Sequence, residues 1–167
     1  KDRITPALQA NGWWGRQAVH DPVTGKTIVS QLGSPHRLEV IFRTNMQMAY
    51  SVGQWQQIIA QSEQAPYLMY DAVDDYRTRP QHRAWDNIIL RFDNPWWRTH
   101  YPPNGWLCRC GVIQLSDADL DVMGLKVSDT PKINYYNWQN PRTGKNQKIP
   151  EGIDPGFNYN PGMLRYD

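Results

Sequence analysis

The 167-residue sequence lacks long hydrophobic runs, and it has only two cysteines and almost no net charge. No apolar run approaches the roughly 18 residues that a membrane-spanning helix needs, so we expect no membrane segment. Two cysteines that are one residue apart cannot form the disulfide framework of a small secreted domain. A formal net charge of +2 indicates no protein-wide surface for binding a polyelectrolyte.

Proline, glycine and the large aromatic residues are, by contrast, abundant. The chain has 13 prolines, 12 glycines, 8 tryptophans and 9 tyrosines. Its length suits one domain with a real hydrophobic core. The sequence predicts a loop-rich α+β fold, in which one long helix packs on a small antiparallel sheet and an extended C-terminal arm follows.

The clearest predicted element is a long helix that begins after Ser34 and ends near Ser62. Serine is a favoured N-cap, and Pro35 suits the first helical position. Apolar residues then recur at steps of three and four, which indicates one buried face. We expect the core to contain Leu38, Ile41, Phe42, Ala49 and Val52, and the solvent face to contain Glu39, Gln47 and Gln54.

A polar group interrupts the apolar stripe of this helix. Asn45 falls on the stripe, so we expect it to be paired inside the core or to face another buried polar group. Arg43 is expected to reach a carboxylate such as Asp74 or Asp75. These contacts would fix the position of the helix.

Short elements are expected after the helix. A further short helix has Ser116 as its predicted N-cap. The expected ranges are 66–74, 88–90 and 110–115 for strands and 117–123 for the helix.

The two ends of the chain are expected to be less regular. Residues 1–33 are predicted to be irregular, with a tight turn at 21–25 that suits a short hairpin. Residues 126–167 mix basic and aromatic residues without periodicity. We therefore divide the chain into a core domain, 1–125, and an extended arm, 126–167, that adds little to the core.

The stretch from Asp74 to Cys110 contains both cysteines, two of the four histidines and four of the eight tryptophans. A Cys-x-Cys disulfide would close a very small, strained ring, whereas two thiolates at this spacing can bind one metal ion. We therefore predict a structural zinc site with the ligands His82, His100, Cys108 and Cys110. Trp106 is expected to shield the thiolates, and Arg109 to point outward to a partner or an acid. The alternative is a buried, reduced cysteine pair with His82 as a hydrogen-bonded orienting residue.

Two strings stand out in this stretch: Asp75-x-Arg77-Thr78-Arg79-Pro80-x-His82 and Pro102-Pro103-Asn104-Gly105-Trp106-x-Cys108-Arg109-Cys110. Three more lie outside it: Gly12-Trp13-Trp14-Gly15, Arg43-Thr44-Asn45 and Asp154-Pro155-Gly156-Phe157-x-Tyr159-Asn160-Pro161-Gly162. In this order the strings resemble the phage Mu-type head-morphogenesis (minor head protein) family over nearly the whole chain.

The resemblance implies a non-enzymatic component of capsid assembly that binds portal or capsid proteins, located in the virion head and, during assembly, in the host cytoplasm. A cysteine-rich branch of the family carries Cys-x-x-Cys where this chain has Arg79-x-x-His82, which supports His82 as a ligand. Structural or interaction roles are expected for residues in or beside the strings: Arg43, Asn45, Asp75, Arg77, Arg79, Trp106 and Arg109.

Two functions other than capsid assembly are compatible with parts of the sequence. Asp75, His82, His100 and the cysteine pair contain the residue types of a metal-dependent hydrolase or nuclease, but no nucleophile elbow, phosphate loop or His-Glu-x-x-His string is present. The basic and aromatic residues of 126–148 suit weak, salt-dependent contact with packaged DNA. We expect a protein that binds and does not catalyse.

Overall fold

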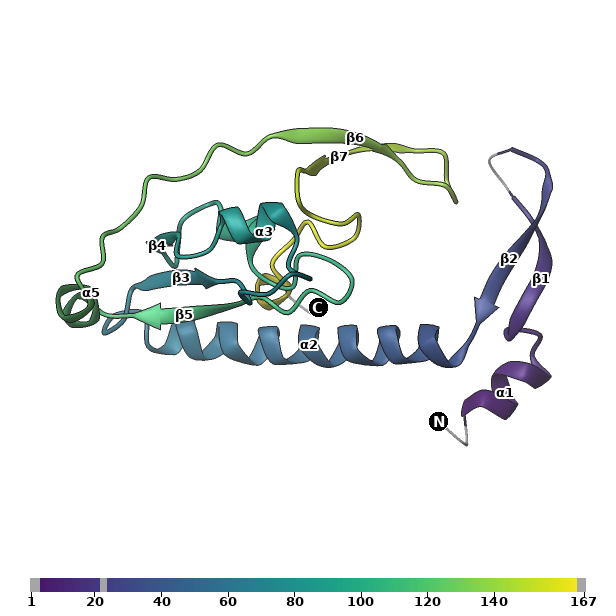
Figure 1. The fold of residues 1–167 in the computed structure, drawn as a ribbon, viewed down its shortest axis with the longest axis horizontal. Helices are drawn as coiled ribbons and strands as arrows, with labels where there is room; N and C mark the ends of the chain where they lie inside the picture. The colour runs from purple at the N-terminus through teal and green to yellow at the C-terminus, as the bar shows by residue number, and fades with distance from the viewer. Residues whose placement is uncertain (1–3, 22–23, 165–167) are drawn as a thin grey trace. The chain divides into compact units, whose positions relative to one another are not determined.

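The computed structural model describes residues 4–21 and 24–164. It confirms the α+β class, with one long helix and small sheets (Figure 1). Its elements are α1 (Ile4–Ala10), β1 (Gly15–His20), β2 (Thr27–Gly33), α2 (Pro35–Ala60), β3 (Tyr67–Asp71), α3 (Pro80–Ala84), β4 (Ile89–Arg91), α4 (Trp97–His100), β5 (Gly111–Leu115), α5 (Asp117–Met123), β6 (Tyr135–Gln139), β7 (Asn146–Pro150) and the 3-10 helix η1 (Pro161–Met163).

The chain forms two compact units. The first contains residues 1–43 and 137–147, and the second contains residues 44–136 and 148–167. The helix α2 begins in the first unit and ends in the second. None of the helices in the described ranges combines the length and the hydrophobicity needed to cross a bilayer.

The first unit contains α1 and the antiparallel hairpin of β1 and β2, in which His20 lies opposite Thr27. This confirms the predicted hairpin around the turn at 21–25, although residues 22 and 23 lie outside the described ones. The helix α1 forms where we expected irregular chain. No described hydrophobic side chain of this unit is buried.

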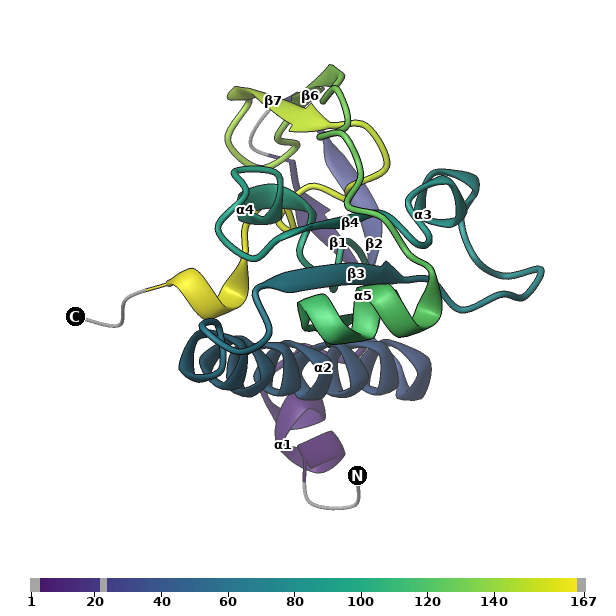
Figure 2. The same cartoon turned by 90° about the vertical axis from the view of Figure 1, so that its left-hand side faces the viewer.

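The second unit is built on a three-stranded antiparallel sheet in the order β4-β3-β5. All three strands agree with the predicted ones, and Tyr67 lies opposite both Arg91 and Leu115. The sheet lies along α2 in both views (Figures 1 and 2). Leu68 and Tyr70 of β3 belong to the main core cluster together with Trp55 and Ile58 of α2.

The helix α2 starts at Pro35 and ends close to the predicted position, but its buried face is not the predicted one. Phe42 is 67% exposed, and Ile41 and Ala49 are also exposed. The helix has apolar residues around much of its circumference, so steps of three and four fit more than one face. Trp55 is 2% exposed and lies in the main core cluster, and burial of such a large aromatic side chain favours this orientation. The buried residues are Thr44, Ser51, Trp55 and Ile58.

The polar residues of α2 also differ from the expectation. Asn45 is exposed and lies outside the core. Arg43 does not reach Asp74 or Asp75, because it pairs with Glu39 one turn earlier on the same helix at 2.8 Å. Both differences have the same cause: the buried face of α2 is not the predicted one, and residues 43 and 45 face solvent.

The helix α5 confirms its predicted boundaries. The Ser116 side chain accepts a hydrogen bond from the Asp119 N–H at 3.2 Å, and the Asp119 carboxylate accepts one from the Ser116 N–H at 2.8 Å. This reciprocal pair is a capping box. Gly124 ends the helix in the left-handed conformation, with φ of 63°.

The predicted arm is part of the core near its end. Ile149, Ile153 and Phe157 are at most 5% exposed, and Gly162 packs on the Trp55 side chain. The expectation that residues 126–167 add little to the core is therefore wrong for this part. These apolar residues follow no regular period because the segment is mostly loop, so the sequence pattern does not reveal their burial. The domain boundary at 125 stays a prediction.

Candidate metal centre

The helix α3 positions the first residue of the site. Arg79 is its N-cap in an extended conformation, and Pro80 takes the first helical position, where a missing N–H costs nothing. His82 follows within the first turn and is 2% exposed. The Arg79-Pro80 pair thus starts a five-residue helix that points His82 inward.

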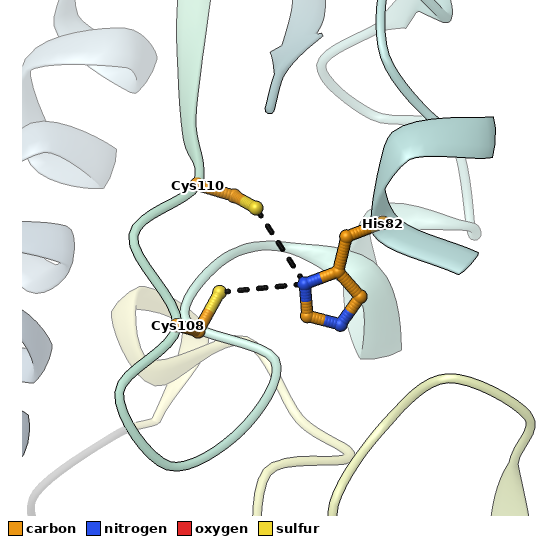
Figure 3. Close-up of side chains that lie close together, drawn as sticks. All are labelled: His82, Cys108 and Cys110. Carbon is orange, nitrogen blue, oxygen red and sulfur yellow. Dashed lines mark hydrogen bonds between the residues drawn. The ribbon is translucent and has the colours of Figure 1, made fainter. Parts of the chain in front are cut away.

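The loop before β5 positions the two cysteines. Cys108 and Cys110 are each 6% exposed and free of disulfide bonds. Their sulfur atoms lie 3.7 Å and 3.5 Å from the Nδ1 atom of His82 (Figure 3). Three of the four predicted ligands therefore converge, with their donor atoms all within 4.8 Å of one another.

The other ring nitrogen of His82 fixes the tautomer. Nε2 lies 2.8 Å from the carbonyl oxygen of Gly152. A carbonyl oxygen can only accept, so Nε2 carries the proton, and the lone pair of Nδ1 faces the two sulfur atoms. A histidine that ligates a metal usually donates its other N–H to a carbonyl or a carboxylate in this way.

The distances fit a tetrahedral metal ion. With bonds of about 2.3 Å to sulfur and about 2.0 Å to nitrogen, tetrahedral angles separate sulfur from nitrogen by about 3.5 Å. The observed separations are 3.5 Å and 3.7 Å. The buried cluster can therefore bind a metal through two sulfur atoms and one imidazole nitrogen.

The two thiols differ in acidity. A hydrogen bond from Cys110 lowers the pKa of Cys108, and backbone N–H groups of Asn104 and Cys110 act in the same direction, against the effect of burial. The hydrogen bond to Cys108, together with burial, raises the pKa of Cys110. Of the two sulfur atoms, Cys108 is therefore the one whose surroundings favour the thiolate.

His100 does not join the cluster. Its Nδ1 atom lies 2.8 Å from the hydroxyl oxygen of Thr99, and its ring stacks on Trp96 with centroids 4.4 Å apart. The Trp85 ring contacts both His82 and His100, at 5.1 Å and 4.9 Å between centroids. His100 is thus one of the aromatic core residues, and burial lowers its pKa to about 4.

Asp75 and Arg109 form a pair at the surface of the cysteine loop. The two guanidinium nitrogens of Arg109 each donate to one carboxylate oxygen of Asp75, both at 2.6 Å. This bidentate pair lowers the pKa of Asp75 and confirms that Arg109 turns outward to an acid. The Arg77 guanidinium lies further away, at 3.7 Å from the same carboxylate, whereas the Arg77 backbone N–H donates to it at 2.9 Å.

Arg79 joins the cysteine loop to the C-terminal segment. Its guanidinium donates to Asp154 at 2.7 Å and to the Trp106 carbonyl at 3.3 Å. The Asp154 carboxylate also accepts from the Trp106 N–H at 2.9 Å. These bonds pass close to Gly105, where a side chain would overlap both Arg79 and Asp154.

Trp106 does not shield the cysteines as we expected. It is 50% exposed and packs edge-on against Phe157, at 5.2 Å between ring centroids. Trp85 is the tryptophan that packs on the site, since its ring stacks on that of His82. The contact between Gly152 and His82 could not be predicted from the sequence. The residues Pro150-Glu151-Gly152 indicate a turn, but nothing in this turn points to His82.

The fold and the site together define a small α+β domain built around a buried Cys-x-Cys and histidine cluster. Residues 16–113 match the family described as Phage Mu protein F like protein. The chain belongs to this family, which confirms the resemblance of its strings.

Two curated relatives extend the match. The chain is 37% identical to capsid assembly protein F of Escherichia phage Mu over 98% of its own length. It is 41% identical to the Mu-like prophage FluMu F protein of Haemophilus influenzae over 77% of its length. These alignments span 40% and 30% of the two relatives. No solved structure is similar enough to count as a match.

Proposed function

We propose that the chain acts in head morphogenesis of a phage or prophage by binding portal or capsid components. The observation that carries this proposal is the similarity to capsid assembly protein F of phage Mu along 98% of the chain. The place of action would be the head, and the host cytoplasm during assembly. Weak, salt-dependent contact with packaged DNA through exposed basic residues is compatible with this role.

Binding would use exposed apolar side chains, which a capsid partner can cover. Tyr76, Tyr50 and Val122 are 91%, 72% and 87% exposed, and all three belong to the second unit. Aromatic residues are enriched in the centres of protein interfaces because they bury much area with few rotatable bonds. Charged residues are depleted there, and residues 44–62 contain none.

The test is co-expression of the chain with the portal and capsid proteins of the same phage, followed by affinity purification. We expect one of them to be recovered with the wild type and less of it with Tyr50→Glu. The control is Gln57→Glu, which adds the same charge to another exposed position of α2. Recovery of neither head protein with the wild type would contradict the proposal.

We propose further that the chain does not catalyse. The hydrolase alternative needs an acid and a base around the cysteines. Asp75 instead makes two hydrogen bonds to Arg109, and His100 pairs with Thr99. Hydrolysis of DNA, RNA or peptides by the wild type, and its loss in His82→Ala, would overturn this proposal.

For the metal, we propose a structural zinc ion held by His82, Cys108 and Cys110. Thiolate and imidazole ligands are those that zinc prefers in structural sites, and the three side chains supply three of the four ligands of a tetrahedral ion. Since the site joins α3 to the cysteine loop, its binding energy would also be folding energy. A chelator should therefore lower the unfolding temperature of the wild type but not of Cys108→Ser. Equal responses of the two proteins would contradict a bound zinc.

A further inference from the structure

The segment from Ile149 to Phe157, here called the C-terminal strap, lies against the residues that form the metal centre. Ile149 is fully buried, and Ile153 and Phe157 are nearly so. The strap contacts both halves of the site, since it touches α3 on one side and the cysteine loop on the other. Gly152 makes the contact with α3, and Asp154 makes the contacts with the cysteine loop.

On the α3 side, the contact is made by Gly152. Its carbonyl oxygen accepts the hydrogen bond from His82 Nε2 at 2.8 Å. Its φ of 86° is in the left-handed region, and a Cβ here would lie 2.7 Å from the Trp85 ring and 2.8 Å from Gln81. Only glycine brings the strap backbone this close to His82.

On the side of the cysteine loop, the contact is made by Asp154. Its carboxylate accepts from Arg79 and from the Trp106 N–H, and its own N–H donates to the Asn104 carbonyl at 2.9 Å. Asn104 belongs to the cysteine loop and precedes Cys108 by four residues. The strap is therefore one hydrogen bond away from His82, and Asp154 ties it to the loop that carries Cys108.

We propose that the C-terminal strap is the positioning element of the metal centre, with Gly152 holding His82 in its metal-binding tautomer. This inference rests on the proposed zinc site. Without the Gly152 carbonyl, the proton of neutral His82 can move to Nδ1, which then cannot bind a metal. By linkage, whatever the docked strap adds to zinc affinity, bound zinc adds to the docking of the strap.

The first experiment measures zinc affinity by competition with a chromophoric chelator. Asp154→Ala removes the carboxylate that ties the strap to Arg79 and to the Trp106 N–H, and it leaves all three ligands in place. Since the Gly152 carbonyl is then held less firmly against His82, we expect zinc to bind more weakly, by up to the roughly 10- to 100-fold that the loss of an outer-shell partner costs. The control is Asp93→Ala, which removes an exposed carboxylate that pairs with Arg91 and should leave the affinity unchanged.

The second experiment uses the wild type alone, so it does not depend on whether the variant folds. Amide hydrogen exchange is measured with one equivalent of zinc and after treatment with a chelator. We expect faster exchange in residues 149–157 without zinc and little change in α5, whose buried Leu120 belongs to a different core cluster from Cys108 and Cys110. Equal exchange of the strap in both states would overturn the coupling.

The zinc affinities of the wild type and of Asp154→Ala distinguish the positioning role of the strap from zinc binding itself. If the wild type binds no zinc, both fail. If the wild type binds zinc and Asp154→Ala binds it equally well, the zinc site stands and the positioning role of the strap is overturned. A weaker zinc affinity in Asp154→Ala, with the Asp93→Ala control unchanged, supports the inference.

Discussion

The Nε2 atom of His82 lies 2.8 Å from the carbonyl oxygen of Gly152, which is 70 residues further along the chain. This bond joins a short helix near the middle of the sequence to a loop near its end. It also leaves Nδ1 free to face Cys108 and Cys110. The hydrogen bonding of the central cluster thus includes a segment that the sequence around His82 and the cysteines does not reveal.

Gly105→Ala tests the packing between the cysteine loop and the strap. A Cβ at this position would overlap the guanidinium of Arg79 and the carboxylate of Asp154. We expect a loss of about 1–3 kcal/mol in the free energy of unfolding, as is usual for overpacked sites. Chemical denaturation measures it. Gly111→Ala is the control, because its Cβ would meet nothing within 4 Å; an equal loss in both variants would contradict the overlap.

Trp55→Ala tests the orientation of α2. Trp55 is 2% exposed and contacts the Tyr101 ring at 4.9 Å between centroids. Removing it should cost about 3–5 kcal/mol in urea unfolding, as for other buried aromatic residues. Phe42→Ala should change stability by about 0.5 kcal/mol or less, because that side chain is 67% exposed. The reverse order of the two losses would show that the predicted face is the buried one.

Ile149→Ala tests whether the strap belongs to the core. Its side chain is fully buried, so we expect a loss of about 2–5 kcal/mol in the free energy of unfolding. Leu164→Ala, at a position that is 48% exposed, is the matched control and should have little effect. A loss near zero for Ile149→Ala would restore the view of residues 126–167 as a loosely attached arm.

The buried His100 makes stability depend on pH. Burial lowers its pKa from 6.5 to about 4, so the unfolded chain binds a proton at pH values where the folded chain does not. Stability therefore falls as the pH decreases from about 6.5 to about 4, by roughly 3 kcal/mol in total from this group. His100→Gln should reduce this slope. An NMR titration that gives His100 a pKa near 6.5 would show that this histidine does not cause the pH dependence.

Local signals predict much of this fold. Ser34 and Pro35 define the start of α2, Ser116 defines that of α5, and short apolar runs give the three strands of the central sheet. Each of these depends on neighbouring residues alone. The buried face of α2 could not be predicted in the same way, because it is decided by which side chains meet the sheet.

The candidate site, too, could be predicted from the sequence only where it depends on neighbouring residues. The Cys-x-Cys spacing points to two candidate ligands, and the family strings add His82 as a third. Sequence proximity also suggested His100, but the Trp85 ring packs against both histidines and His100 pairs with Thr99. Gly152 could not be found at all, since its role depends on a contact across 70 residues.

X-ray absorption at the zinc edge is the most direct test of zinc binding by His82, Cys108 and Cys110. The protein is purified with one equivalent of zinc, and the first coordination shell is fitted for sulfur and nitrogen. We expect two sulfur atoms at about 2.3 Å and imidazole scattering from one histidine at about 2.0 Å. The histidine signal should disappear in His82→Ala and persist in His100→Gln. A shell without sulfur, or a protein that retains no zinc, would contradict the assignment of this cluster as a metal centre.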